Sequence, residues 1–202
     1  MRRAVGALAI VVCALAAGAV PATAAKKKRP TCFPPHSKTL QIDAKVRVFK
    51  LRHSIYGCLL KRKKLVKFKV GDFPTGFGPI ELAAPYVAYA SYSDCAAAFC
   101  DPNTVVLQDL RGGRATFVDG QAISVAELQS LVLKPNGSLA FITSEFDQNG
   151  SILPGVAVVK VEAGGTPVTL DSGAGVQGDS LALAGSTLYW TNAGVARSAP
   201  LG

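Results

Sequence analysis

Short apolar runs separated by turn residues recur along the chain after its first 25 residues. Four segments begin with apolar residues, cross a few polar or small residues and reach an aromatic residue. The segments begin at 40, 80, 131 and 181, and their aromatic residues are Phe49, Tyr89, Phe141 and Trp190. Further β-rich runs follow at 55–60, 65–70, 105–110, 115–118, 155–161, 167–170 and 195–199. Val, Ile, Phe and Tyr fill these runs, and Gly, Pro, Asn and Asp separate them, which predicts strands joined by tight turns.

Strict alternation in the run 65–70 predicts which side chains face the core. Val66, Phe68 and Val70 are expected to point inward, and Lys67 and Lys69 outward. Between other runs, the pairs Asn136-Gly137 and Asn149-Gly150 predict hairpin turns in which both residues have positive φ.

One segment is ambiguous between helix and strand. Ser124 and Glu127 form a capping-box pattern that is typical of a helix start. The apolar run 131–133 nevertheless aligns with the openings of the other three units. We therefore expect a strand there, with at most a helical turn before it.

The four aromatic residues are 40, 52 and 49 residues apart. A period of about 40–50 residues with four strands per unit is typical of a β-propeller blade. We predict an all-β, propeller-like domain over 38–202, with about four blades of three to four antiparallel strands. The blades are expected at about 38–71, 78–119, 125–171 and 179–202. The last unit is one strand short, so the blades could close alone, remain an open partial propeller or self-associate with a second chain.

One stretch resembles a known blade motif. The sequence LKPNGSLAFITS at 133–144 resembles the S-P-D-G-x-x-[IL]-A-[FY]-x-[ST] motif of TolB-like, WD-type propellers, with Asn136 where that family usually has Asp. The chain also resembles small exported repeat proteins of unassigned function from high-GC bacteria, on VRVF at 46–49, YGC at 56–58, VLQDL at 106–110 and YWT at 189–191. The resemblance implies a propeller-type fold and a binding or scaffolding role, and it implies no reaction.

The N-terminus has the three parts of a secretory signal peptide. Arg2 and Arg3 precede an uncharged run over 4–20, and Pro21 and the small residues 22–25 follow it. The run is shorter than the about 20 residues that a membrane-spanning helix needs. We predict a signal peptide over 1–25, a secreted or extracytoplasmic chain, and no transmembrane segment after signal removal.

Four cysteines remain after the signal peptide. They are Cys32, Cys58, Cys95 and Cys100, an even number that predicts disulfides in an exported chain. Locality favours Cys32–Cys58 and Cys95–Cys100, because neither bond then crosses between repeat units. A metal site at Cys32, His36 and Cys58 lacks a second close pair of ligands, so no metal is predicted.

Charge is distributed unevenly along the chain. Residues 26–70 contain 15 basic residues and one acid, whereas residues 71–202 contain 5 basic and 12 acidic residues. Residues 26–37 are expected to form a basic, disordered tail. The candidate polyanion contacts are Lys61, Arg62, Lys63, Lys64, Lys67 and Lys69. The plainer interpretation is a solvated basic surface, and sparse aromatic residues argue against sequence-specific nucleic-acid binding.

No motif predicts a catalytic residue or a cofactor. Residues 178–181 spell the GDSL esterase motif, but His36 and His53 both lie far upstream, and a serine without a base is a weak nucleophile.

Tyr86 and Tyr92 are expected to share one strand face, with Tyr89 in the core.

We therefore expect an exported, non-enzymatic binding or scaffolding module for an unknown protein or an anionic cell-envelope polymer. The alternatives are a hydrolase with a site at the propeller mouth, and a purely structural domain.

Overall fold

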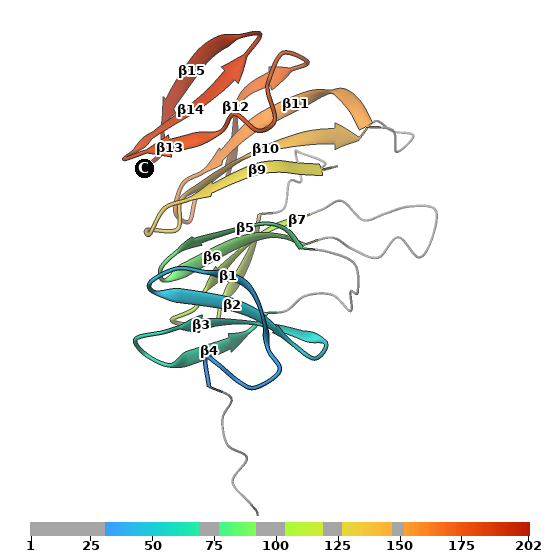
Figure 1. Cartoon of the computed structure of the whole chain (residues 1–202). Coiled ribbons are helices and arrows are strands. Elements are labelled where there is room, and N and C mark those ends of the chain that lie inside the picture. The colour runs from blue at the N-terminus through green and yellow to red at the C-terminus, as the bar shows by residue number, and fades with distance from the viewer. Residues whose placement is uncertain (1–30, 69–76, 92–103, 119–126, 147–151) are drawn as a thin grey trace, which may run out of the picture.

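The computed structural model describes residues 31–68, 77–91, 104–118, 127–146 and 152–202. These residues form four antiparallel sheets and contain no helix, so the all-β prediction is confirmed. The sheets are stacked one above another along the molecule (Figure 1). No helix in this part of the chain is long and apolar enough to cross a membrane.

Each sheet is a meander in which neighbouring strands follow one another in sequence. The first sheet contains β1 (Lys38–Ile42), β2 (Val46–Leu51), β3 (Ser54–Leu59) and β4 (Lys64–Lys67), and the second contains β5 (Phe77–Ala83), β6 (Tyr86–Ser91), β7 (Thr104–Asp109) and β8 (Ala115–Val118). The third contains β9 (Glu127–Leu133), β10 (Leu139–Phe146), β11 (Ile152–Val161) and β12 (Pro167–Gly173), and the fourth contains β13 (Ala182–Ala184), β14 (Thr187–Asn192) and β15 (Val195–Pro200).

The predicted aromatic residues are all buried. Tyr89 lies between the first and second sheets, where its ring stacks on Phe68 with centroids 5.0 Å apart. Phe141 belongs to the core between the second and third sheets, and Trp190 to the core between the third and fourth. Phe49 faces the other side of the first sheet, next to a disulfide.

The alternation predicted for β4 is confirmed where the structure describes it. Val66 and Phe68 are buried and Lys67 is exposed. The strand itself ends at Lys67, and Lys69 and Val70 lie outside the described residues.

Strand rather than helix is confirmed from Glu127 onward, since β9 begins there. Ser124 and the two residues after it lie outside the described ranges. In the fourth sheet, β13 begins at Ala182, one residue later than the repeat alignment predicts.

The hairpin between β9 and β10 differs from the prediction. Of the pair Asn136-Gly137, only Gly137 has a positive φ, at 95°. The Lys134 N–H donates to the Ser138 carbonyl at 2.8 Å and the Gly137 N–H to the Lys134 carbonyl at 3.0 Å. The loop is therefore three residues long, with Pro135 and Asn136 in a type I turn and Gly137 in the bulge position. Asn149-Gly150 falls outside the described part of the chain.

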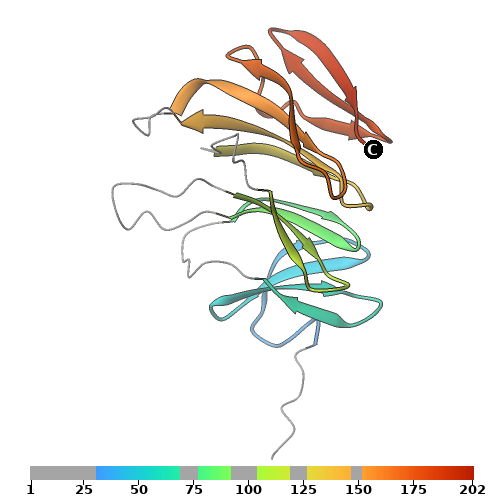
Figure 2. The same ribbon diagram turned by 180° about the vertical axis from the view of Figure 1, so that it is seen from behind.

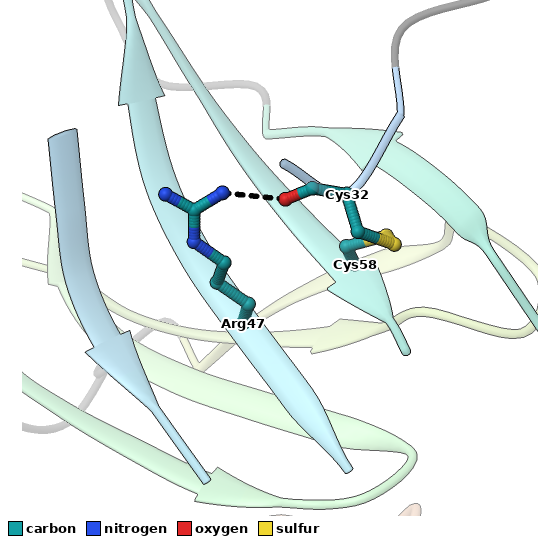
Figure 3. The surroundings of a disulfide bond; sticks show 3 residues. All are labelled: Cys32, Arg47 and Cys58. Carbon is teal, nitrogen blue, oxygen red and sulfur yellow. Dashed lines mark hydrogen bonds between the residues drawn. A yellow bond between two sulfur atoms is a disulfide. The ribbon is translucent and has the colours of Figure 1, made fainter. Parts of the chain in front are cut away.

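A segment before β1 packs against the face of the first sheet that carries Phe49, where Cys32, Phe49 and Cys58 form a small buried cluster. Figure 3 shows Cys32 beside Arg47 and Cys58. Cys32 forms the predicted disulfide with Cys58, whereas Cys95 and Cys100 are not among the described residues. Residues 31–37, which are expected from the sequence to belong to a disordered tail, are held here by the disulfide and by Arg47 of β2. The Arg47 Nη1 atom donates to the Cys32 carbonyl at 2.5 Å, and Nη2 donates to Ser37 Oγ at 3.1 Å.

Candidate functional site

Three turns meet at one edge of the first two sheets. They are the turns after β1 (43–45), after β3 (60–63) and after β7 (110–114). The Leu60 N–H donates to the Lys45 carbonyl at 2.9 Å, which joins the first two turns. The Lys64 ammonium donates to the Arg111 carbonyl, which joins the first sheet to the second. This edge is the one nearest the C label in Figure 1.

Exposed cationic side chains gather on this edge, which we call the basic edge. It consists of Lys45, Lys61, Arg62, Lys63, Lys64, Arg111 and Arg114. In the described chain, no ion pair neutralises Lys61, Arg62 or Lys63. Such a concentration of like charge raises the local positive potential and attracts anions.

Both acids on the basic edge are held by other groups. The Asp43 carboxylate accepts the N–H groups of Lys45 and Val46, each at 2.6 Å, and so stabilises the turn. The Asp109 carboxylate pairs with the Arg111 Nε atom at 3.2 Å. Partial burial alone raises the pKa of Asp109, but the hydrogen bonds and charge of Arg111 outweigh burial and hold that pKa below its usual value. Asp109 therefore remains ionised and neutralises Arg111.

The sequence-predicted contacts are partly brought together. The turn between β3 and β4 contains Lys61, Arg62 and Lys63, and Lys64 is the first residue of β4. Lys67 lies at the other end of β4. Lys69 lies outside the described residues. The other basic-edge residues lie outside the predicted set of contacts; they are Lys45, Arg111 and Arg114. For Lys45 the meander itself was a usable signal, because the first and third turns of a meander lie at the same edge of the sheet.

Arg111 is fixed rather than free. Its Nη2 atom donates to the Tyr86 hydroxyl at 2.6 Å, and its guanidinium lies 5.1 Å from the centroid of the Tyr86 ring. Tyr86 is partly buried, Tyr89 is fully buried as predicted, and Tyr92 is not among the described residues. Tyr86 is thus held by protein contacts on the basic edge.

A cleft of about 390 Å³ opens between the second and third sheets on this same edge. Its walls include Tyr86, Asp109, Arg114, Thr116 and Asn136, together with the glycine-rich turn 163–165. The two sheets are adjacent when seen from either side (Figures 1 and 2).

A second cleft, of about 370 Å³, lies between the third and fourth sheets. Asp171 lines it and accepts hydrogen bonds from Trp190 Nε1 at 2.7 Å and Asn192 Nδ2 at 3.0 Å. The bond from Trp190 is the main reason why the pKa of Asp171 lies below its ordinary value. Here the carboxylate is used to connect the two sheets.

The GDSL serine makes local hydrogen bonds. The Ser180 hydroxyl donates to the Gln177 carbonyl at 2.7 Å and accepts the Thr191 N–H at 2.9 Å. His36 lies in the segment before β1, and His53 lies in the turn between β2 and β3. The first sheet is at the opposite end of the stack from the fourth sheet (Figure 1). Among the described residues, no three His, Cys, Asp or Glu side chains cluster as a metal site would require.

No family model matches this chain, and no curated protein matches it. It is similar to two solved structures from B. thetaiotaomicron, described as the extracellular domain of BT4673 in a one-component system and in a hybrid two-component system. Each shares 12% sequence identity with a TM-score of 0.32, and each match covers 75% of this chain and 24% of that chain. This likeness is too low to assign a fold family or a ligand.

Proposed function

We propose that this chain is an exported, non-enzymatic binding module of propeller-like form that docks on an anionic polymer of the cell envelope. The observation that carries the proposal is the basic edge, where cations from three turns and two sheets gather. Holding like charges close together costs free energy, and a polyanion relieves that cost and releases its condensed counterions.

Export is supported by two independent features of the sequence and structure. Residues 1–25 have the pattern of a signal peptide, and Cys32 is bonded to Cys58. Structural disulfides persist mainly in oxidising compartments outside the cytoplasm. The four stacked meanders support a propeller-like arrangement, since three of them have the four-strand order of a blade and the fourth has the same order with three strands.

A hydrolytic function receives less support. Nucleophilic catalysis by serine needs a base within hydrogen-bond reach. The Ser180 hydroxyl instead bonds to the Gln177 carbonyl and the Thr191 N–H. These bonds fit a role in connecting the turn before β13 to β14.

The test is calorimetric titration of the exported chain, disulfides intact, with teichoic acid at rising salt concentration. In one triple variant, Lys61, Arg62 and Lys63 are each replaced by glutamine. The matched control replaces Lys38, Lys50 and Arg52, which are also two lysines and one arginine, exposed, and in the first sheet. Arg52 and Lys63 both have positive φ, at 55° and 48°, so the backbone demand is matched as well.

We expect wild-type affinity to fall steeply with salt. Each neutralised polymer charge contributes about 0.7–0.9 to the slope of log K against log salt concentration, so the first variant should reduce that slope by about 2. The control should keep most of the affinity. Binding that is independent of salt, or equal losses in both variants, would contradict docking through the basic edge and favour a merely solvated surface.

A further inference from the structure

We infer that the cleft between the second and third sheets binds one anionic sugar unit, with Arg114 as its contact for the charged group. The inference rests on the proposed function and specifies the polymer as an acidic glycan. The shared chemistry is a hydroxyl-rich ring that carries one carboxylate or phosphate.

The size and place of the cleft suit a small ligand. Its volume of about 390 Å³ lies at the lower end of the range for ligand pockets, about 300–1,000 Å³. It opens on the basic edge, beside the turn 110–114 that Lys64 binds. A glycan chain held along the turn 60–63 can therefore place a neighbouring unit in the cleft.

Arg114 is the cation that the protein leaves available there. In the described chain its guanidinium makes no ion pair or hydrogen bond, whereas Arg111 is occupied by Asp109 and Tyr86. The Arg114 backbone is well fixed, since its carbonyl accepts the Asp109 N–H at 2.8 Å and Gln108 Nε2 at 3.0 Å. An unpaired guanidinium on a held backbone can present paired donors in the geometry that carboxylates and phosphates accept.

The facing wall suits the uncharged part of a sugar. Turn 163–165 has only a methyl group and two glycines, and Gly164 has no atom within 4 Å of the position that a Cβ would occupy. The Ala163 and Gly165 N–H groups are bonded to Ser138 Oγ and the Glu162 carbonyl, so this wall is small and smooth rather than rich in free donors. On the opposite wall, Thr116 of β8 adds an exposed hydroxyl beside Arg114. Asp109 also lines the cleft, but Arg111 neutralises it, so it does not repel an anion.

The first experiment titrates the exported chain with trigalacturonate, which tests the carboxylate, and with glucose 1-phosphate, which tests the phosphate. Neutral galactotriose is the control ligand. We expect one of the two anionic probes to bind, and the one that binds identifies the anionic group. Its binding should shift the amide resonances of Gly137, Gly164 and Gly165, which line the cleft, and leave Gly185 and Gly194 in the fourth sheet unchanged.

Two variants separate a local contact from general charge. Arg114→Gln should weaken the bound probe by about tenfold or more, as expected for loss of a charge-assisted hydrogen bond. Lys50→Gln removes the same charge from an exposed site in β2 and should change affinity less than twofold. Ala163→Phe should block the cleft without any change in charge and abolish probe binding.

The inference is overturned if neither anionic probe binds at millimolar concentration, or if Arg114→Gln and Lys50→Gln have equal effects. It is also overturned if galactotriose binds as tightly as the anionic probes. These results are distinguishable from failure of the proposed function, because teichoic acid docking depends on Lys61, Arg62 and Lys63 and is measured separately. Retained polymer docking without probe binding contradicts the cleft alone.

Discussion

Arg47 and Cys32 are joined by a hydrogen bond of 2.5 Å, from the guanidinium Nη1 to the carbonyl oxygen (Figure 3). The residue that forms the disulfide is thus also held by a buried cation of β2. The guanidinium lies 4.6 Å from the ring centroid of Phe33 and 4.7 Å from that of Phe49. Burial lowers the pKa of Arg47, and these contacts compensate for the lost solvation.

Replacing Arg47 should therefore destabilise the chain. In Arg47→Met, the Cys32 carbonyl and the Ser37 and Thr39 hydroxyls lose their donor, and we expect the free energy of unfolding to fall by about 2–3 kcal/mol. Arg47→Lys should recover only part of this loss, since an ammonium cannot make the same forked contacts. Urea unfolding measures the effect, with exposed Lys50→Met as the control; equal stability of the Met variants would contradict the role of Arg47.

The disulfide makes a second, separable contribution. Cys32 and Cys58 are 26 residues apart, so loss of the bond in the double variant Cys32→Ser, Cys58→Ala should cost about 3.5 kcal/mol. Thermal unfolding of both forms checks the value. Peptide mapping without reduction should also find Cys95 bonded to Cys100, and a Cys58–Cys95 link would disprove the proposed pairing.

Gly57 should not tolerate a side chain. A Cβ atom there would lie 2.6 Å from the Leu110 Cδ2 atom and 2.7 Å from the Phe68 Cε1 atom. Phe68 cannot move freely because its ring stacks on Tyr89, so we expect Gly57→Ala to cost about 1–3 kcal/mol in denaturant unfolding. Gly112→Ala is the control, since the nearest atom to its Cβ would be 3.9 Å away; similar losses in both would refute the close approach.

Acid should weaken the contact between the third and fourth sheets. Asp171 has a folded-state pKa below its ordinary value, chiefly because of the Trp190 hydrogen bond. Its stabilising effect is therefore present above the pKa of the unfolded chain and is lost as pH falls through the lower, folded-state value. Asp171→Asn should remove this part of the acid sensitivity and cost about 1 kcal/mol at neutral pH.

Fluorescence can follow this change, since Trp190 is the single tryptophan of the chain. The emission of the wild type should shift on acidification, and that of Asp171→Asn should not. Exposed Asp179→Asn should behave as wild type. An unchanged acid response in Asp171→Asn would contradict the assignment.

Much of the architecture could be predicted because strand periodicity is local. The burial of Tyr89 and Phe141 and the inward side chains of β4 follow from patterns a few residues long. The Cys32–Cys58 bond likewise lies within one unit. The turn at Asn136 was predicted incorrectly, because loop length depends on where strand pairing begins, and pairing starts at Leu133 and Leu139.

The candidate site was harder to predict for a different reason. The turn cations Lys61–Lys64 form one charge run, but Arg111 and Arg114 lie about 50 residues later and reach them only through sheet stacking. The role of Arg47 was also not evident, since an arginine between two apolar residues resembles an ordinary outward position. Its burial depends on the segment 31–37, which covers that face.

The covered face of the first sheet makes the stack directional. Another sheet could pack there only by displacing residues 31–37, which Cys32 ties covalently to β3. Duplication of a unit during evolution, or assembly of copies face to face, would meet this barrier at the first sheet. Any extension of the stack would therefore have to proceed from the side of the fourth sheet.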